Sequence, residues 1–241
     1  MSAPARRGEA AASRGPAYRW VYLWHWPIRA MHWVAAGSIL LLIVTGFYIG
    51  RPYFVANPAD TSQLFLMGTM RFLHFAAAGA LVATAIVRVY WLLVGNRYEN
   101  WKALLPVDPK SLRNVLRMMR KYLLFRWHEG PHYVGHNPMQ QLAYTGFYAV
   151  LLVQIATGFA LYGLADPEGF FFRVFGWETR FFGGVPVVRF VHHVLTWVVI
   201  IFVPVHVYLG VRTEFTDRDG TITSIISGGR WVRDDVHYED A

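Results

Sequence analysis

The chain has 241 residues, of which 55% are hydrophobic and 16% are charged, and its formal net charge is +8. Such an apolar composition is unusual for a soluble domain and typical of a membrane protein. The chain contains no cysteine. Disulfides, thiolate-bound zinc, iron–sulfur clusters and covalently attached haem are therefore excluded from this chain.

In chain order, a polar start is followed by four long apolar stretches, which occupy residues 27–50, 72–95, 141–163 and 190–211. About 20 apolar residues in a helix cross a bilayer core. The sequence therefore predicts an all-α integral membrane protein, a four-transmembrane-helix bundle that forms one membrane domain over residues 1–241. Residues 1–24 and 212–241 are predicted to be tails, and Pro204 is expected to kink the fourth span or to free one backbone carbonyl.

Lysine and arginine are concentrated in the two tails and in the link between the second and third spans. The positive-inside rule places such segments in the cytoplasm, so both termini and the long link are predicted to be cytoplasmic. The basic link is interpreted as a solvated face against anionic lipid, with no nucleic acid as a partner.

Histidines occur inside three of the four predicted spans. His32 lies near the cytoplasmic start of the first span, and His74 lies near the outer start of the second. The fourth span carries His192 and His193 near its outer start and His206 near its cytoplasmic end. Ionisable residues inside a membrane are by default functional, so one pair of candidates is predicted at each depth.

Helix geometry distinguishes the two adjacent histidines. His192 and His206 are fourteen residues apart, and fourteen steps of about 100° return to within roughly 40° of the starting direction. His193 and His206 are thirteen residues apart and point to roughly opposite sides. The predicted pairs are therefore His32 with His206 and His74 with His192, separated by about 21 Å along the helix axis.

Two imidazoles at equal depth on different helices suit the two axial positions of a non-covalent haem, so the pattern predicts two bis-histidine haem b groups in the bundle. Zinc requires three or four close ligands, and no span carries such a cluster. The alternative is that these histidines only form hydrogen bonds between helices.

An arginine stands three residues before a histidine in three spans, at Arg29, Arg71 and Arg189. This spacing places each arginine beside its histidine on one helix face, where a guanidinium could bind a haem propionate. Arg88 lies fourteen residues after His74 and is predicted to reach the propionates of the cytoplasmic haem. The alternative is that these arginines extend to lipid headgroups.

Other histidines lie outside the spans. His25, between two tryptophans, is interpreted as part of an interfacial aromatic belt. His128, His132 and His136 recur at four-residue intervals, but intervening glycines and a proline break a helix there, so a solvated loop is predicted.

Two segments resemble motifs of one family. RAMHWVAAGSILLLIVTG, residues 29–46, resembles the first-helix motif of the b-type cytochrome subunit of membrane-bound nickel–iron hydrogenases. RFVHHVLTWVVIIFVPVH, residues 189–206, resembles the last-helix motif of that family. The resemblance extends over nearly the whole chain and departs from the motifs at Ala30 and Phe190. The gamma subunit of formate dehydrogenase is similar in its four spans and histidine spacing, but the doubled histidine favours the hydrogenase branch.

The resemblance implies an electron-transport subunit in the bacterial inner membrane. Such subunits anchor a periplasmic dimer, formed by an iron–sulfur small subunit and a nickel–iron large subunit, and have no hydrogen-splitting centre of their own. Electrons would enter at an outer haem on His74 and His192, pass to an inner haem on His32 and His206, and leave to a membrane quinone. The alternatives are a cytochrome b subunit of another membrane oxidoreductase, such as formate dehydrogenase, or a haem-free membrane anchor.

Overall fold

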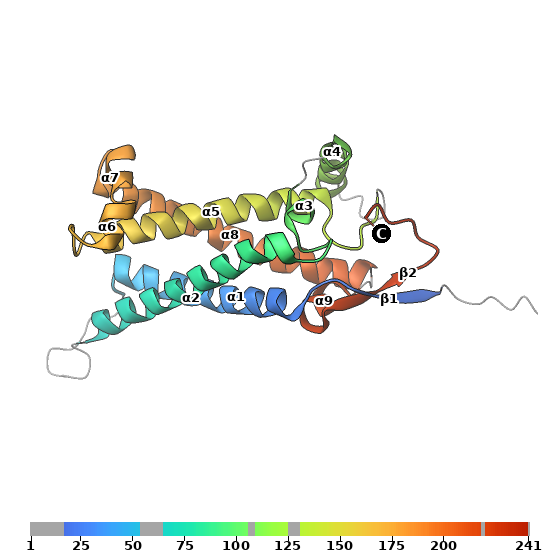
Figure 1. The fold of residues 1–241 in the computed structure, drawn as a ribbon, viewed down its shortest axis with the longest axis horizontal. Helices are drawn as coiled ribbons and strands as arrows, with labels where there is room; N and C mark the ends of the chain where they lie inside the picture. Colours follow the sequence, from blue (N-terminus) through green and yellow to red (C-terminus); the bar gives the residue numbers. More distant parts are fainter. Residues whose placement is uncertain (1–16, 54–64, 106–108, 125–130, 218–219, 241) are drawn as a thin grey trace, which may run out of the picture.

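The structure, a computed structural model, describes residues 17–53, 65–105, 109–124, 131–217 and 220–240. Its body consists of four long helices, α1 (Trp26–Gly50), α2 (Leu66–Val94), α5 (Pro138–Gly163) and α8 (Val185–Asp217). These helices run along the long axis of the molecule and alternate in direction (Figure 1). We call the end of the bundle where the described chain begins and finishes the terminal end, and the opposite end the far end.

The four helices expose most of their apolar surface. Ile86 and Ile201 are each 66% exposed, and Leu93 is 76% exposed. Each of the four helices is long and apolar enough to cross a membrane, and apolar surface on this scale marks contact with lipid. The interior of the bundle is narrow, with a buried cluster of Ile39, Leu81 and Val199 near its middle.

The observed helices overlap the four predicted ranges. α1 and α5 begin within three residues of the predicted starts, whereas α2 begins six residues early and α8 extends beyond 190–211 at both ends. The predicted spans were too short because the mean hydropathy falls near the arginines at the ends of the apolar stretches. Arginine nevertheless favours helix, so the helices continue past these residues. α8 continues through Pro204, whose missing N–H leaves the carbonyl of Ile200 without its usual helical donor.

A capping box sets the start of α5. The Asn137 side chain accepts a hydrogen bond from the backbone N–H of Gln140 at 3.0 Å, and the Gln140 side chain accepts one from the backbone N–H of Asn137 at 2.9 Å. Pro138 occupies the first turn, where its missing N–H costs nothing. His132 and His136 therefore precede the helix, in a segment that is non-helical as predicted. The prediction that this loop is solvated was wrong for His136, which packs between the rings of Trp24 and Tyr144.

A two-stranded ribbon closes the terminal end. Strand β1 (Tyr18–Tyr22) pairs antiparallel with β2 (Gly229–Arg233), with Trp20 opposite Trp231. A small core of Leu23, Trp24, Val134 and Val232 packs beside the ribbon. The predicted tails, residues 1–24 and 212–241, thus contain ordered structure, and the all-helical prediction missed this ribbon. Residues 1–16 of the first tail lie outside the described residues.

Short helices lie at both ends of the bundle. At the terminal end they are α3 (Trp101–Leu104), α4 (Pro109–Leu123) and α9 (Thr221–Ser227), and at the far end α6 (Phe170–Phe175) and α7 (Trp177–Phe181) (Figure 1). The basic link is therefore helical in its middle. α4 buries Val115 and Met118, which are 7% and 3% exposed, because apolar residues at this spacing share one helix face.

Candidate functional site

At the terminal end, α1 and α8 bring His32 and His206 together. The ring centroids lie 6.3 Å apart with an interplanar angle of 50°. Phe202 stacks parallel to the His206 ring at 5.8 Å, and Tyr144 of α5 meets the same ring edge-on at 5.8 Å. We call His32 and His206 the terminal-end pair.

At the far end, His74 of α2 and His192 of α8 are each held by a threonine of a different helix. The Nδ1 atom of His74 lies 2.9 Å from Thr45 Oγ1 of α1, and that of His192 lies 3.0 Å from Thr157 Oγ1 of α5. We call His74 and His192 the far-end pair.

A glycine beside each threonine lets the imidazole approach the neighbouring helix. A Cβ atom on Gly46 would lie 3.3 Å from Cε1 of His74, and a Cβ on Gly158 would lie 3.3 Å from Cε1 of His192. These separations are tighter than an ordinary van der Waals contact, so a side chain at either position would press on the ring. The two rings of the far-end pair therefore have equivalent surroundings.

The adjacent residue His193 has different surroundings. His193 is exposed, whereas His192 is half-buried. Its Nε2 atom lies 3.5 Å from the position that a Cβ on Gly50 would take, near the far end of α1. The structure thus directs His192 toward Thr157 and His193 toward the end of α1, which agrees with the helical phase that favoured His192.

The four candidate arginines divide into two groups. Arg71 and Arg189, at the far end, are exposed. Arg29 and Arg88, at the terminal end, are half-buried, and each has a buried Nε without a hydrogen-bond partner among the described residues. Arg29 donates from Nη1 to the carbonyl of Ile226, and Arg88 donates from Nη1 to the carbonyl of Glu99 at 2.8 Å. Both guanidinium groups thus retain buried donor capacity.

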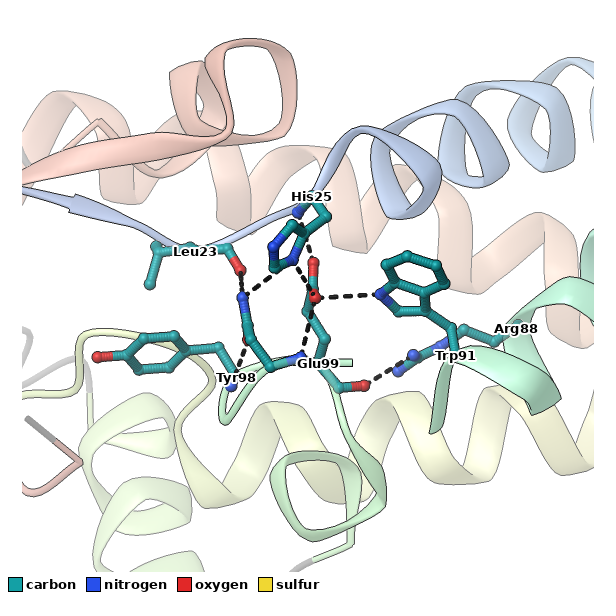
Figure 2. Close-up of polar contacts among 7 residues, drawn as sticks. Leu23, His25, Arg88, Trp91, Tyr98 and Glu99 are labelled. Carbon is teal, nitrogen blue, oxygen red and sulfur yellow. Dashed lines mark hydrogen bonds and ion pairs between the residues drawn. The ribbon is translucent and has the colours of Figure 1, made fainter. Parts of the chain in front are cut away.

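Glu99 organises the terminal end, and it was not singled out in the sequence. Its side chain is fully buried and gathers donors from two segments (Figure 2). Oε2 lies 2.7 Å from Nδ1 of His25 and accepts a hydrogen bond from Nε1 of Trp91 at 3.0 Å. The backbone N–H groups of His25 and Asn96 also donate to this carboxylate. The His25 ring contacts the rings of Tyr22 and Trp91, and its contact with Glu99 was not predicted.

His136 lies between the ribbon and α5, with its ring centroid 4.8 Å from that of Trp24 and 5.0 Å from that of Tyr144. Burial lowers the pKa of His136 to about 3, and the positive charges of Arg88 and Arg230 add to the effect. At neutral pH this imidazole is therefore uncharged.

The lowered pKa of His136 predicts that acid weakens the fold. Below pH 6.5 the unfolded chain binds a proton at His136, whereas the folded chain does not bind it until about pH 3. The free energy of unfolding therefore decreases as the pH falls through this range, by at most about 1.4 kcal/mol per pH unit. Melting of the detergent-solubilised chain between pH 7.5 and 5 checks this. His136→Phe is expected to reduce the change of melting temperature with pH, whereas His237→Gln, at an exposed position, is expected to leave that change as it is in the wild type. If the wild type and both variants show the same change of melting temperature with pH, His136 is not its cause.

The imidazole donors at both pairs suit a bis-histidine haem, and at the terminal-end pair the ring separation does so as well. Each Thr hydroxyl lies within hydrogen-bond distance of a backbone carbonyl of its own helix, so its oxygen can accept a hydrogen bond from Nδ1–H of His74 or His192. Nε2 is then left without a proton and able to bind iron. At the terminal-end pair, the 6.3 Å centroid separation leaves room for one metal atom with two bonds of roughly 2 Å.

A bare metal ion is a poorer fit. No group of three or more histidine, aspartate or glutamate side chains that could hold one is found in the part of the chain that the structure describes. His128, which belongs to the predicted loop, lies outside that part.

The sequence contained one unused signal for the far-end site. The tripeptide Thr-Gly-Phe occurs at residues 45–47 near the end of α1 and again at residues 157–159 near the end of α5. Only the structure shows that each copy faces a histidine of the next long helix.

Comparisons with known proteins identify the family of this chain. Residues 23–228 match the family described as prokaryotic cytochrome b561. The chain is 39% identical over 218 residues to a probable Ni/Fe-hydrogenase B-type cytochrome subunit of Azotobacter vinelandii, covering 89% of this chain and 90% of the relative. It is 37% identical to that of Bradyrhizobium diazoefficiens, covering 94% and 92%. It is 30% identical to the probable Ni/Fe-hydrogenase 1 B-type cytochrome subunit of Escherichia coli K12, covering 87% and 90%.

Proposed function

Because the chain belongs to the prokaryotic cytochrome b561 family, as a hydrogenase-associated b-type cytochrome subunit, we propose that it is a di-haem electron carrier. In this proposal it anchors a periplasmic nickel–iron hydrogenase and passes electrons from hydrogen oxidation to the membrane quinone pool. The observation that supports the proposal is the contact of His32 with His206 at the terminal end, together with His74 and His192 at the far end, each bonded to a threonine of a neighbouring helix.

The chain's own residues would hold the two cofactors. His32 and His206 would bind one haem iron, and His74 and His192 would bind the other. Haem iron supplies reversible one-electron oxidation and reduction. The fourteen residues between His192 and His206 place the two sites about 21 Å apart along α8, which spans most of a bilayer core of about 30 Å.

The arginines would bind the propionates. Arg29 and Arg88, with their buried and unpartnered Nε atoms, would serve the terminal-end haem. Arg71 and Arg189 would serve the far-end haem from the headgroup level, since both are exposed. A guanidinium pairs with a carboxylate through two parallel hydrogen bonds, which fixes orientation as well as charge.

The interior between the two pairs would keep water out. The buried cluster of Ile39, Leu81 and Val199 lies between the two depths. On the terminal-end side, Phe147 stacks on Phe202 at 4.0 Å, and Phe202 stacks in turn on His206. A dry, apolar environment around a haem is one of the factors by which a protein sets its potential.

The distribution of positive charge supports an orientation of the bundle in the membrane. The described parts of the link and of both chain ends, which are rich in lysine and arginine, lie at the terminal end (Figure 1), so the positive-inside rule would place this end in the cytoplasm. The far end would then face the periplasm of a bacterial inner membrane. The iron–sulfur small subunit would dock there and bring the nickel–iron large subunit with it, and quinone would accept electrons near the terminal end.

A haem count tests the proposal most directly. Reduced-minus-oxidised spectra and extracted haem from the purified complex are expected to give two non-covalent haems per chain, with nickel present in the complex. A complex that keeps its partner but contains no haem would leave only a membrane anchor. Molybdenum in place of nickel would point to a formate dehydrogenase partner.

A further inference from the structure

The far-end pair is supported by a repeated structural unit that the terminal-end pair lacks. Thr45 and Gly46 of α1 contact His74 of α2, and Thr157 and Gly158 of α5 contact His192 of α8. In each copy the threonine hydroxyl meets Nδ1, and the following glycine faces the Cε1 edge of the same ring. The same contact is thus made twice, by two different helix pairs.

The direction of these hydrogen bonds follows from counting hydrogens. A threonine hydroxyl has one hydrogen to donate and lone pairs to accept. Thr45 donates to the carbonyl of Leu41 at 2.6 Å, and Thr157 donates to the carbonyl of Val153 at 2.8 Å. Each hydroxyl oxygen is therefore free to accept from the Nδ1–H of its histidine.

The terminal-end pair differs in this respect. Nδ1 of His32 is buried and has no hydrogen-bond partner among the described residues. An acceptor for the Nδ1–H of a metal-binding histidine fixes the tautomer and the ring orientation, and it raises the basicity of the ligand. A more basic ligand favours the oxidised iron and so lowers the reduction potential, which second-shell hydrogen bonds help to set.

We propose that Thr45 and Thr157 are positioning residues that fix the far-end imidazoles with Nε2 toward the haem. By accepting the Nδ1–H hydrogen bonds, they lower the reduction potential of the far-end haem below that of the terminal-end haem. This inference rests on the haem ligation in the proposed function. It provides a reason for electrons to move from the far end to the terminal end. Gly46 and Gly158 contribute by letting each ring approach its threonine.

Paired substitutions separate the hydrogen bond from packing. Thr45→Val and Thr157→Val remove the acceptor and retain the shape, whereas Thr45→Ser and Thr157→Ser retain the hydroxyl. Thr213→Val is the matched control, since Thr213 of α8 also donates to the carbonyl four residues back, that of Leu209, at 2.9 Å. The readout is a redox titration of the haem spectrum in the complete complex, with the two haem components resolved.

The valine variants are expected to raise the midpoint of the lower-potential component, while the serine variants and Thr213→Val keep both midpoints at wild-type values. A valine variant could lose the far-end haem altogether. In that case, the proposal is supported if the serine variant at the same position keeps this haem at its wild-type midpoint potential. Unmoved midpoints in both valine variants, or loss of haem in the serine variants as well, would overturn the inference. A wild-type complex without haem would instead overturn the proposed function.

Discussion

His192→Ala is expected to remove the far-end haem, whereas His193→Ala is expected to leave both haems in place. His192 is half-buried, and its Nδ1 is bonded to Thr157 with the ring against Gly158. In the proposed ligation, the iron of that haem would then have His74 as its single histidine ligand from this chain. His193 is exposed and directed toward Gly50, so alanine at that position removes no proposed ligand.

The measurement is the haem content per chain in the purified complex, with the reduced-minus-oxidised spectrum to identify which component is lost. About half of the wild-type haem is expected in His192→Ala and the full amount in His193→Ala. The two variants are matched in chemistry and differ by one position in the same helix. Loss of haem in His193→Ala alone would show that Pro204 or tertiary packing alters the phase of α8 and that His193 is the ligand.

Glu99→Ala is expected to destabilise the fold by roughly 3–5 kcal/mol, because the Glu99 side chain is fully buried and each buried donor left without its acceptor costs about 1–3 kcal/mol. The change leaves Nδ1 of His25, Nε1 of Trp91 and the N–H of Asn96 without their acceptor (Figure 2). In a chain of this size such a loss lowers the melting temperature by about 10 °C. Melting of the purified chain in detergent measures it.

An exposed glutamate provides the control for Glu99. Glu168 pairs with Arg173 at 3.9 Å, and its side chain is 92% exposed, so Glu168→Ala is expected to change stability by less than about 1 kcal/mol. Glu99→Gln retains one acceptor oxygen and is expected to melt between Glu99→Ala and wild type. If Glu99→Ala and Glu168→Ala melt at the same temperature, the buried carboxylate does not stabilise the terminal end.

The loss of Glu99 is also expected to affect the two haems unequally. His25 immediately precedes α1 and is tied to Glu99 through both its backbone N–H and its ring, and His32 follows seven residues later. Freeing this start of α1 loosens the terminal-end pair, while Thr45 and Thr157 still hold the far-end pair. On heating Glu99→Ala, the terminal-end haem is therefore expected to be released first.

Local pattern alone was sufficient to locate the four long helices and the candidate ligands. A membrane span is a run of about 20 apolar residues, so the signal for each span lies within its own segment. The fourteen-residue separation of His192 and His206 needs only the pitch of one helix to place both on one face. The described parts of the link and of both chain ends lie at one end of the bundle because four antiparallel spans alternate in direction (Figure 1). These features depend on short stretches and on topology.

Tertiary structure decided which groups support those ligands. The bonds from His74 to Thr45 and from His192 to Thr157 join residues 29 and 35 positions apart, and His25 meets Glu99 across 74 positions. β1 and β2 pair the start of the described chain with its end. Such contacts depend on how separate helices and strands pack together. The periodicity of residues within one segment therefore does not predict them. The sequence by itself therefore determined the spans and the histidine spacing, and only the packed bundle assigned hydrogen-bond partners to the rings of His74 and His192.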